Sequence, residues 1–295
     1  MKHSWPLLLT AALTSGCGSL RQPPLPQSAQ IAAVAPAPMV DDAWAAKVRS
    51  ADAIYFSLTE SAMAAGQPIW HIVRLLQASG QPVALGWAEV PATQQPLFEQ
   101  WKGQEISAAQ LLDQLVRPER AAFFRGALRP DLGHAALGCP GKLLGKIRDG
   151  ETLSEEEQAQ LPTGFHPRPD AFEIFADRVT ASARLRRYNI RRLYRAHLVA
   201  EQTIAENIVR FRREHPQWKL LVFLPNDAMI DPREVAAFAA QKMPLRQLIL
   251  DRSQPLQEAQ PQLLARGRRS LFKVVDCSPG AARHDRRLAA PRLRA

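Results

Sequence analysis

Tyr194 and His197 are the two side chains whose types and spacing could do the most chemistry in this 295-residue sequence. Residues three apart on a helix are neighbours on its surface, so the pair shares one face of the helix predicted here. A phenolate oxygen is a donor for ferric iron, and a flanking guanidinium would lower the pKa of the phenol. Arg191 and Arg195 flank the pair, and residues 178–200 contain seven arginines and no acid.

A structural interpretation of the same segment remains open. A tyrosine beside a leucine on an amphipathic helix usually packs at the edge of the core, and a run of arginines usually forms a solvated face. The second part of this segment has apolar residues at a 3.6-residue spacing, which predicts one buried face: Leu193, Ala196, Ala200, Ile204, Ile208 and Phe211.

Cys17 follows a short apolar run that closes with small residues, which is typical of a bacterial lipoprotein signal. The run is far shorter than the roughly 20 residues that span a bilayer, so we expect a cleaved signal over 1–16 and a lipid on Cys17. An ordinary secretory signal, cut elsewhere, is the alternative. Gly18 follows the cysteine, which favours the periplasmic face of the outer membrane.

Composition divides the rest of the chain into three parts. Residues 17–45 are rich in Pro, Ala and Gln and predict an extended, disordered tether. Residues 46–252 have an ordinary globular composition, and residues 253–295 form a basic tail that we expect to be largely disordered. The formal net charge is +10, but the predicted lipid anchor and the lack of a base-reading module argue against nucleic acid as a partner.

Alternating strands and helices predict an α/β fold. Near-continuous apolar strands indicate a mainly parallel central sheet with helices on both faces. The long helical stretch before the fourth strand predicts a helical insertion. The expected strands are 53–58, 82–87, 135–138, 219–224 and 245–250. The expected helices are 69–78, 94–101, 107–115, 119–128, 141–149 and 170–213, and the last range is long enough for two helices. A capping sequence at Ser154 and Glu157 and an N-cap at Asp231 predict two further helix starts.

These elements, in this order, resemble the ChaN-like, haem-binding uptake lipoproteins of the Tiki superfamily. The resemblance lies in residues 84–90 with 94–97, in residues 193–197 running into 205–208, and in the strand, turn and helix over 220–240. It covers about residues 48–252. It implies an α/β fold, a lipid anchor and periplasmic haem binding in iron acquisition.

The sequence departs from the family at two strand-end turns. The family has a Gly-Glu-x-His type turn where this chain keeps Glu60 without the histidine, and a Gly-Asn-x-His type turn where it keeps Asn226. Related members hold a divalent metal there, so Glu60, Glu89 and Asp227 are weak candidates for a Ca²⁺ or Mn²⁺ site. A decayed site is the simpler interpretation, and metal-dependent hydrolysis is the minor alternative.

Haem needs an axial donor, an apolar slot and cations for its propionates. We therefore expect Tyr194 to ligate ferric haem, His197 to act as a ligand or hydrogen-bond partner, and Arg191 and Arg195 to hold the propionates. The predicted function is capture in haem uptake, without catalysis. The resemblance implies a TonB-dependent haem receptor or a periplasmic haem carrier as partner. A scaffold without cofactor is the alternative. A homodimer and a disulfide between Cys139 and Cys277 are left open.

Overall fold

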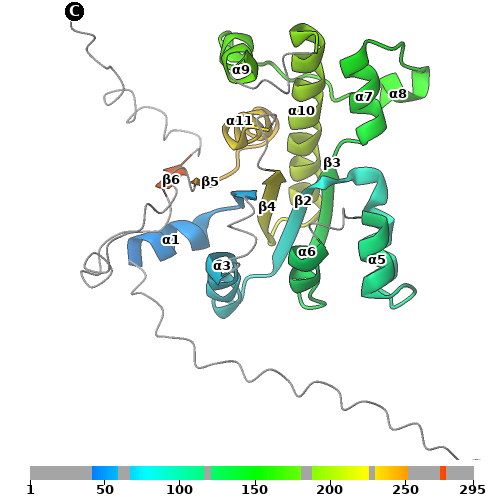
Figure 1. Ribbon diagram of the computed structural model, residues 1–295. Coiled ribbons are helices and arrows are strands. Elements are labelled where there is room, and N and C mark those ends of the chain that lie inside the picture. The colour runs from blue at the N-terminus through cyan, green and yellow to red at the C-terminus, as the bar shows by residue number, and fades with distance from the viewer. Residues whose placement is uncertain are drawn as a thin grey trace, which may run out of the picture. The chain divides into compact units, whose positions relative to one another are not determined.

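A six-stranded sheet in the order β3-β2-β4-β1-β5-β6 forms the centre of the protein (Figure 1). The computed structural model describes residues 42–58, 67–115, 121–180, 188–225, 230–251 and 273–276, all within a unit that spans residues 39–295. The strands are β1 (Ala53–Leu58), β2 (Val83–Pro91), β3 (Gly133–Gly138), β4 (Lys219–Pro225), β5 (Gln247–Asp251) and β6 (Lys273–Asp276).

The first five strands are parallel to their neighbours, and β6 pairs antiparallel with β5. The predicted α/β fold with a mainly parallel sheet is therefore confirmed. β6 lies within the range expected to be a disordered tail, so at least residues 273–276 of that range belong to the sheet.

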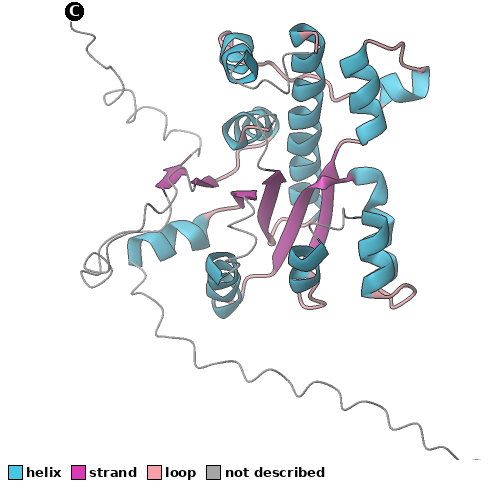
Figure 2. Ribbon diagram, in the orientation of Figure 1, coloured by secondary structure: helices cyan, strands magenta, loops and turns pink. Residues whose placement is uncertain are grey.

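Helices cover both faces of the sheet (Figure 2). Successive residues of a strand point to opposite faces, so the continuous apolar strands supply two separate cores. Ile54, Leu85 and Phe223 face one core, and Tyr55, Ala84 and Val222 face the other. The helices over the first core are α1 (Asp42–Ser50), α3 (Gln67–Ala78), α4 (Gln95–Lys102), α5 (Ala108–Leu115) and α6 (Ala121–Ala127); those over the second are α10 (Ile190–Glu214) and α11 (Pro232–Lys242).

The folded part begins earlier than the predicted boundary between tether and domain. α1 starts at Asp42, inside the range expected to be a tether to residue 45. Ala45 and Val48 of this helix are buried, and Val48 belongs to the first core. Packing against the core therefore orders residues whose composition alone did not predict a helix.

The predicted helical insertion consists of α7 (Gly141–Asp149), α8 (Glu155–Ala159) and α9 (Ala171–Thr180). Ser154 and Glu157 form the expected capping box at the start of α8. α7 packs on Ala196 and Val199 of α10, while α9 packs on Leu193. α10 has 25 residues and is therefore about 37 Å long at 1.5 Å per residue. Its N-terminal part contacts the insertion, while its later turns contact the sheet.

Side-chain amides pair with the outer edge of β3. The Gln95 amide donates to the His134 carbonyl (3.0 Å) and accepts from the Ala136 N–H (2.7 Å). Asn207 of α10 donates to the Leu137 carbonyl (2.9 Å). These bonds fix α4 and α10 against the last strand of the sheet.

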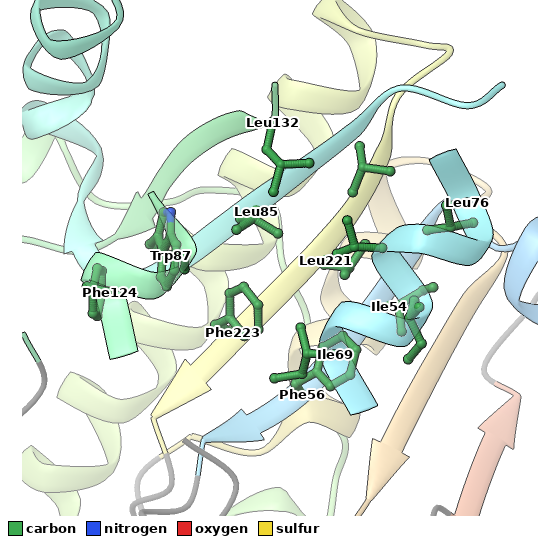
Figure 3. Packing of buried hydrophobic residues seen from close by; sticks show 14 of the residues in the cluster. Ile54, Phe56, Ile69, Leu76, Leu85, Trp87, Phe124, Leu132, Leu221 and Phe223 are labelled. Carbon is green, nitrogen blue, oxygen red and sulfur yellow. The ribbon is translucent and has the colours of Figure 1, made fainter. Parts of the chain in front are cut away.

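Trp87 is the centre of an aromatic cluster in the first core (Figure 3). Its ring centroid lies 4.2 Å from that of Phe124 and 4.9 Å from that of Phe223. The indole N–H donates to Nδ1 of His134 (3.2 Å), so this nitrogen must be the unprotonated one. Burial lowers the pKa of His134 to about 4, and the imidazole is a neutral component of the core.

Candidate functional site

Tyr194 and His197 lie in the first two turns of α10. The side chain of Asn189 accepts hydrogen bonds from the backbone N–H groups of Arg191 and Arg192, which begins the helix at Ile190. Asn at the N-cap satisfies amide groups that have no partner within the helix. The long helical segment 170–213 is thus divided into α9 and α10, as its length suggested.

Tyr194 is partly buried among aromatic rings from α9. Its ring centroid lies 5.1 Å from that of Phe172 and 5.3 Å from that of Phe175. Burial raises the pKa of Tyr194 above its ordinary value, and the carboxyl groups of Glu201 and Glu234 raise it further.

The expectation that flanking arginines lower the pKa of this phenol is wrong. The guanidinium that acts to lower it belongs to Arg168, in the loop before α9, and burial outweighs its effect. The run of arginines in the sequence of α10 does not predict the raised pKa of Tyr194. That pKa depends on acids of α10 and α11 and on burial under the rings of α9.

His197 and Glu201 form a buried pair one turn further along α10. The side chains are 2% and 0% exposed, and His197 Nε2 lies 3.2 Å from Glu201 Oε2. Burial lowers the pKa of His197 to about 3 and raises that of Glu201 well above its usual value. His197 is therefore neutral near pH 7, so the pair is not a salt bridge.

Three buried polar atoms of this region have no hydrogen-bond partner within the described residues. They are Nδ1 of His197, Oε2 of Glu201 and Nε of Arg178. The short distance between the histidine and the glutamate does not satisfy Oε2, since its geometry is not that of a hydrogen bond. Buried polar atoms are nearly always paired, so this group of three marks the site as unusual.

Charged residues join the three helices around this pair. Glu201 accepts a hydrogen bond from the Asp231 backbone N–H (2.7 Å). Asp231 caps α11, as the sequence predicted, and pairs with Arg178 of α9 (3.3 Å). Arg168 pairs with the buried Glu234 of α11 (2.6 Å). Helices α9, α10 and α11 are therefore held together at the tyrosine–histidine pair.

Arg191 and Arg195 are exposed on α10, on either side of Tyr194. Arg192 has a different role, because it donates to the Asp149 carbonyl at the end of α7 (2.9 Å). All three arginines are exposed, and Arg191 and Arg195 are the two left to meet anionic groups of a ligand.

Of the three weak metal candidates, only Glu89 lies within the described residues. Glu89 is partly buried in β2, while Glu60 and Asp227 lie outside the described ranges, as does Cys17. Within those ranges, no group of three His, Cys, Asp or Glu side chains could hold a metal ion. Cys139 has a free thiol, and burial raises its pKa to about 11. Cys277 is also outside the described ranges.

A cavity of about 280 Å³ lies elsewhere, between α4, the later turns of α10 and the edge strand β3. Neither Tyr194 nor His197 lines it. None of the helices in the described ranges is both long enough and apolar enough to cross a membrane.

Sequence reasoning missed Phe172, Phe175 and Glu201. The two phenylalanines are three apart on α9 and share a face, which could have marked an aromatic surface. Glu201 follows His197 by four residues on an otherwise apolar helix face, and an acid there is a signal for a buried polar pair.

Comparisons with known proteins agree with this architecture. The family described as "Haem-binding uptake, Tiki superfamily, ChaN" matches residues 44–225. The solved structure titled "Cofacial heme binding to ChaN of Campylobacter jejuni" is similar with a TM-score of 0.55 and 11% sequence identity. The match covers 72% of this chain and 87% of that one, and at this identity it shows the fold alone. A comparison with curated protein sequences finds no match.

Proposed function

Because the chain belongs to the ChaN family of haem-binding uptake proteins in the Tiki superfamily, we propose that it binds ferric haem through Tyr194. The observation that carries the proposal is the setting of this tyrosine. It is a partly buried phenol packed on two phenylalanine rings, and arginines are exposed three residues before it and one after it. An oxygen donor, aromatic walls and cations are what haem requires from a protein.

The residues present fit this group. Bound ferric haem would supply an iron centre that accepts an anionic oxygen ligand. Tyr194 would provide that oxygen after losing its phenolic proton, although its pKa is raised in the ligand-free protein. The apolar surface that the Phe172 and Phe175 rings cover on α10 would receive the ring system, and Arg191 and Arg195 are placed to pair with propionates. The unpartnered Nδ1 of the buried His197 offers a further polar contact. The function is capture and release of haem, with no chemical turnover.

Titration of the full-length Cys17→Ser protein with haemin tests the proposal. We expect a saturable shift of the Soret band, together with the charge-transfer band of phenolate-bound ferric iron. Tyr194→Phe should abolish that band and weaken binding at least tenfold, which corresponds to about 1.4 kcal/mol. Tyr188→Phe is the matched control, because Tyr188 packs against the same cluster and under Arg148 (5.1 Å). It removes a phenol oxygen there without changing Tyr194, so binding should be unchanged. Absence of a saturable shift, or equal titrations for Tyr194→Phe and the parent, would overturn the assignment.

We further propose that a lipid on Cys17 anchors the protein to the periplasmic face of the outer membrane. The motif around Cys17 supports this location, and family membership supports a role in haem and iron uptake. A TonB-dependent haem receptor or a periplasmic haem carrier would then deliver haem to it or accept haem from it.

Fractionation of the bacterial envelope tests the anchor. The wild-type protein should sediment with the outer membrane and incorporate a labelled fatty acid. Cys17→Ser should lose the label and appear in the soluble fraction, whereas Cys139→Ser should behave as wild type. Wild-type protein found in the soluble fraction without label would contradict the proposal.

A further inference from the structure

Tyr194 and His197 are covered by one helix, α9. The Phe175 ring lies on the His197 ring with a centroid distance of 4.7 Å and an interplanar angle of 28°. Phe172, one turn earlier, meets the Tyr194 ring edge to face at 5.1 Å. The rings of α9 thus occupy the side of α10 from which a flat ligand would approach these two residues.

The attachment of α9 to the rest of the protein is small. α9 buries three of its ten residues, and its apolar cluster with Leu193 is separate from both large cores. An ion pair between Arg178 and Asp231 (3.3 Å) connects α9 to α11. α10, by contrast, buries twelve residues. Elements with few buried apolar contacts open locally more easily than the core does.

Three polar atoms where α9 meets α10 lack hydrogen-bond partners in the part of the chain that the structure describes. Nδ1 of His197, Oε2 of Glu201 and Nε of Arg178 are buried without a hydrogen bond among the described residues. An unsatisfied buried polar group costs free energy, and that cost is relieved when water or a ligand reaches it. The packing of α9 on α10 seen in this structure is therefore less stable than the apolar contacts alone would make it.

From these observations we infer that α9 is a lid over a concealed binding site, and that a flat aromatic macrocycle takes the place of the Phe172 and Phe175 rings when α9 opens. The inference rests on the proposed function, because it names the position of the haem beside Tyr194. Ligand binding then selects an open state that the free protein populates. Because only open molecules can bind, the apparent affinity equals the intrinsic affinity multiplied by the open fraction.

Hydrogen exchange of the ligand-free, full-length Cys17→Ser protein tests the lid without any haem. Amides of α9 should exchange at least tenfold faster than those of the buried turns of α10. Arg178→Gln removes the ion pair and should speed exchange in α9 severalfold, while Arg178→Lys should restore slow exchange. Arg129→Gln is the control, because its ion pair with Asp131 lies outside this cluster and its loss should leave α9 unchanged. Equal protection of α9 and α10 would overturn the lid.

Stopped-flow mixing with haemin then tests what the lid does. Arg178→Gln should associate with haemin at least threefold faster than the parent and the Arg129→Gln control. Equal association rates would show that α9 does not limit access and would overturn the concealed site. If neither the parent nor any variant binds haemin, the proposed function is wrong, and so is the haem position beside Tyr194. The hydrogen-exchange rates would still show whether α9 opens.

Discussion

Trp87→Ala is expected to lower the free energy of unfolding by about 3–5 kcal/mol, the range for removing a large aromatic side chain from a core. The indole is 1% exposed and packs on Phe124 and Phe223 at centroid distances of 4.2 and 4.9 Å. The substitution also removes the donor to Nδ1 of His134 and leaves a buried acceptor unpaired. Both losses act in the same direction.

Urea unfolding followed by circular dichroism at pH 7 measures this effect. Trp44→Ala is the matched control, because Trp44 is partly exposed on α1, where it stacks on His71. It should be clearly less destabilising than Trp87→Ala. Similar losses for the two variants would show that the cluster around Trp87 is not the main source of core stability.

Stability should also fall as the pH is lowered from 6.5 to about 4, because of His134. The pKa of this histidine is about 4 in the folded protein and about 6.5 when unfolded. Within that window the unfolded chain binds a proton that the folded chain does not, so unfolding becomes easier as pH falls. Burial is the main cause of the shift and Lys102 adds to it, whereas the hydrogen bond with the Arg129 backbone carbonyl and the carboxylates of Asp131 and Glu99 oppose it. The full effect is about 3 kcal/mol.

The comparison of wild type with His134→Gln isolates this histidine. His197 contributes to the slope in the same sense, and the raised pKa of Glu201 contributes in the opposite sense. Both groups are present in the variant, so the difference between the two curves reports His134. The variant should be less stable at pH 7 and should show a flatter decline between pH 6.5 and 4. Parallel curves would contradict a neutral, buried imidazole.

Local rules predicted much of the fold from the sequence. The apolar run at 219–224 became β4, the capping sequence at Ser154 starts α8, and Asp231 caps α11. Each of these depends on residues within one turn or one strand. His134 is a residue whose position such local rules did not predict. The expected third strand began at residue 135, because a histidine beside a glycine has no strand pattern, and its burial depends on Trp87, which is 47 residues away.

The candidate site was predicted only in part, for the same reason. The shared helix of Tyr194 and His197 follows from their spacing, but the nearly complete burial of His197 comes from Phe175 on another helix. The pKa of Tyr194 is likewise set by burial and by acids of α10 and α11. Contacts between helices that are distant in sequence cannot be read from the composition of one of them.

The amide groups of Gln95 and Asn207 on β3 have a consequence for how the protein behaves when it is crowded. An open strand edge is a template on which another chain can add a strand, which leads to aggregation. Here the carbonyls of His134 and Leu137 and the N–H of Ala136 are already bonded to side chains. A second copy would have to displace those amides before it could extend the sheet beyond β3. At high protein concentration, the β3 edge is therefore a poor template for a strand from a neighbouring copy.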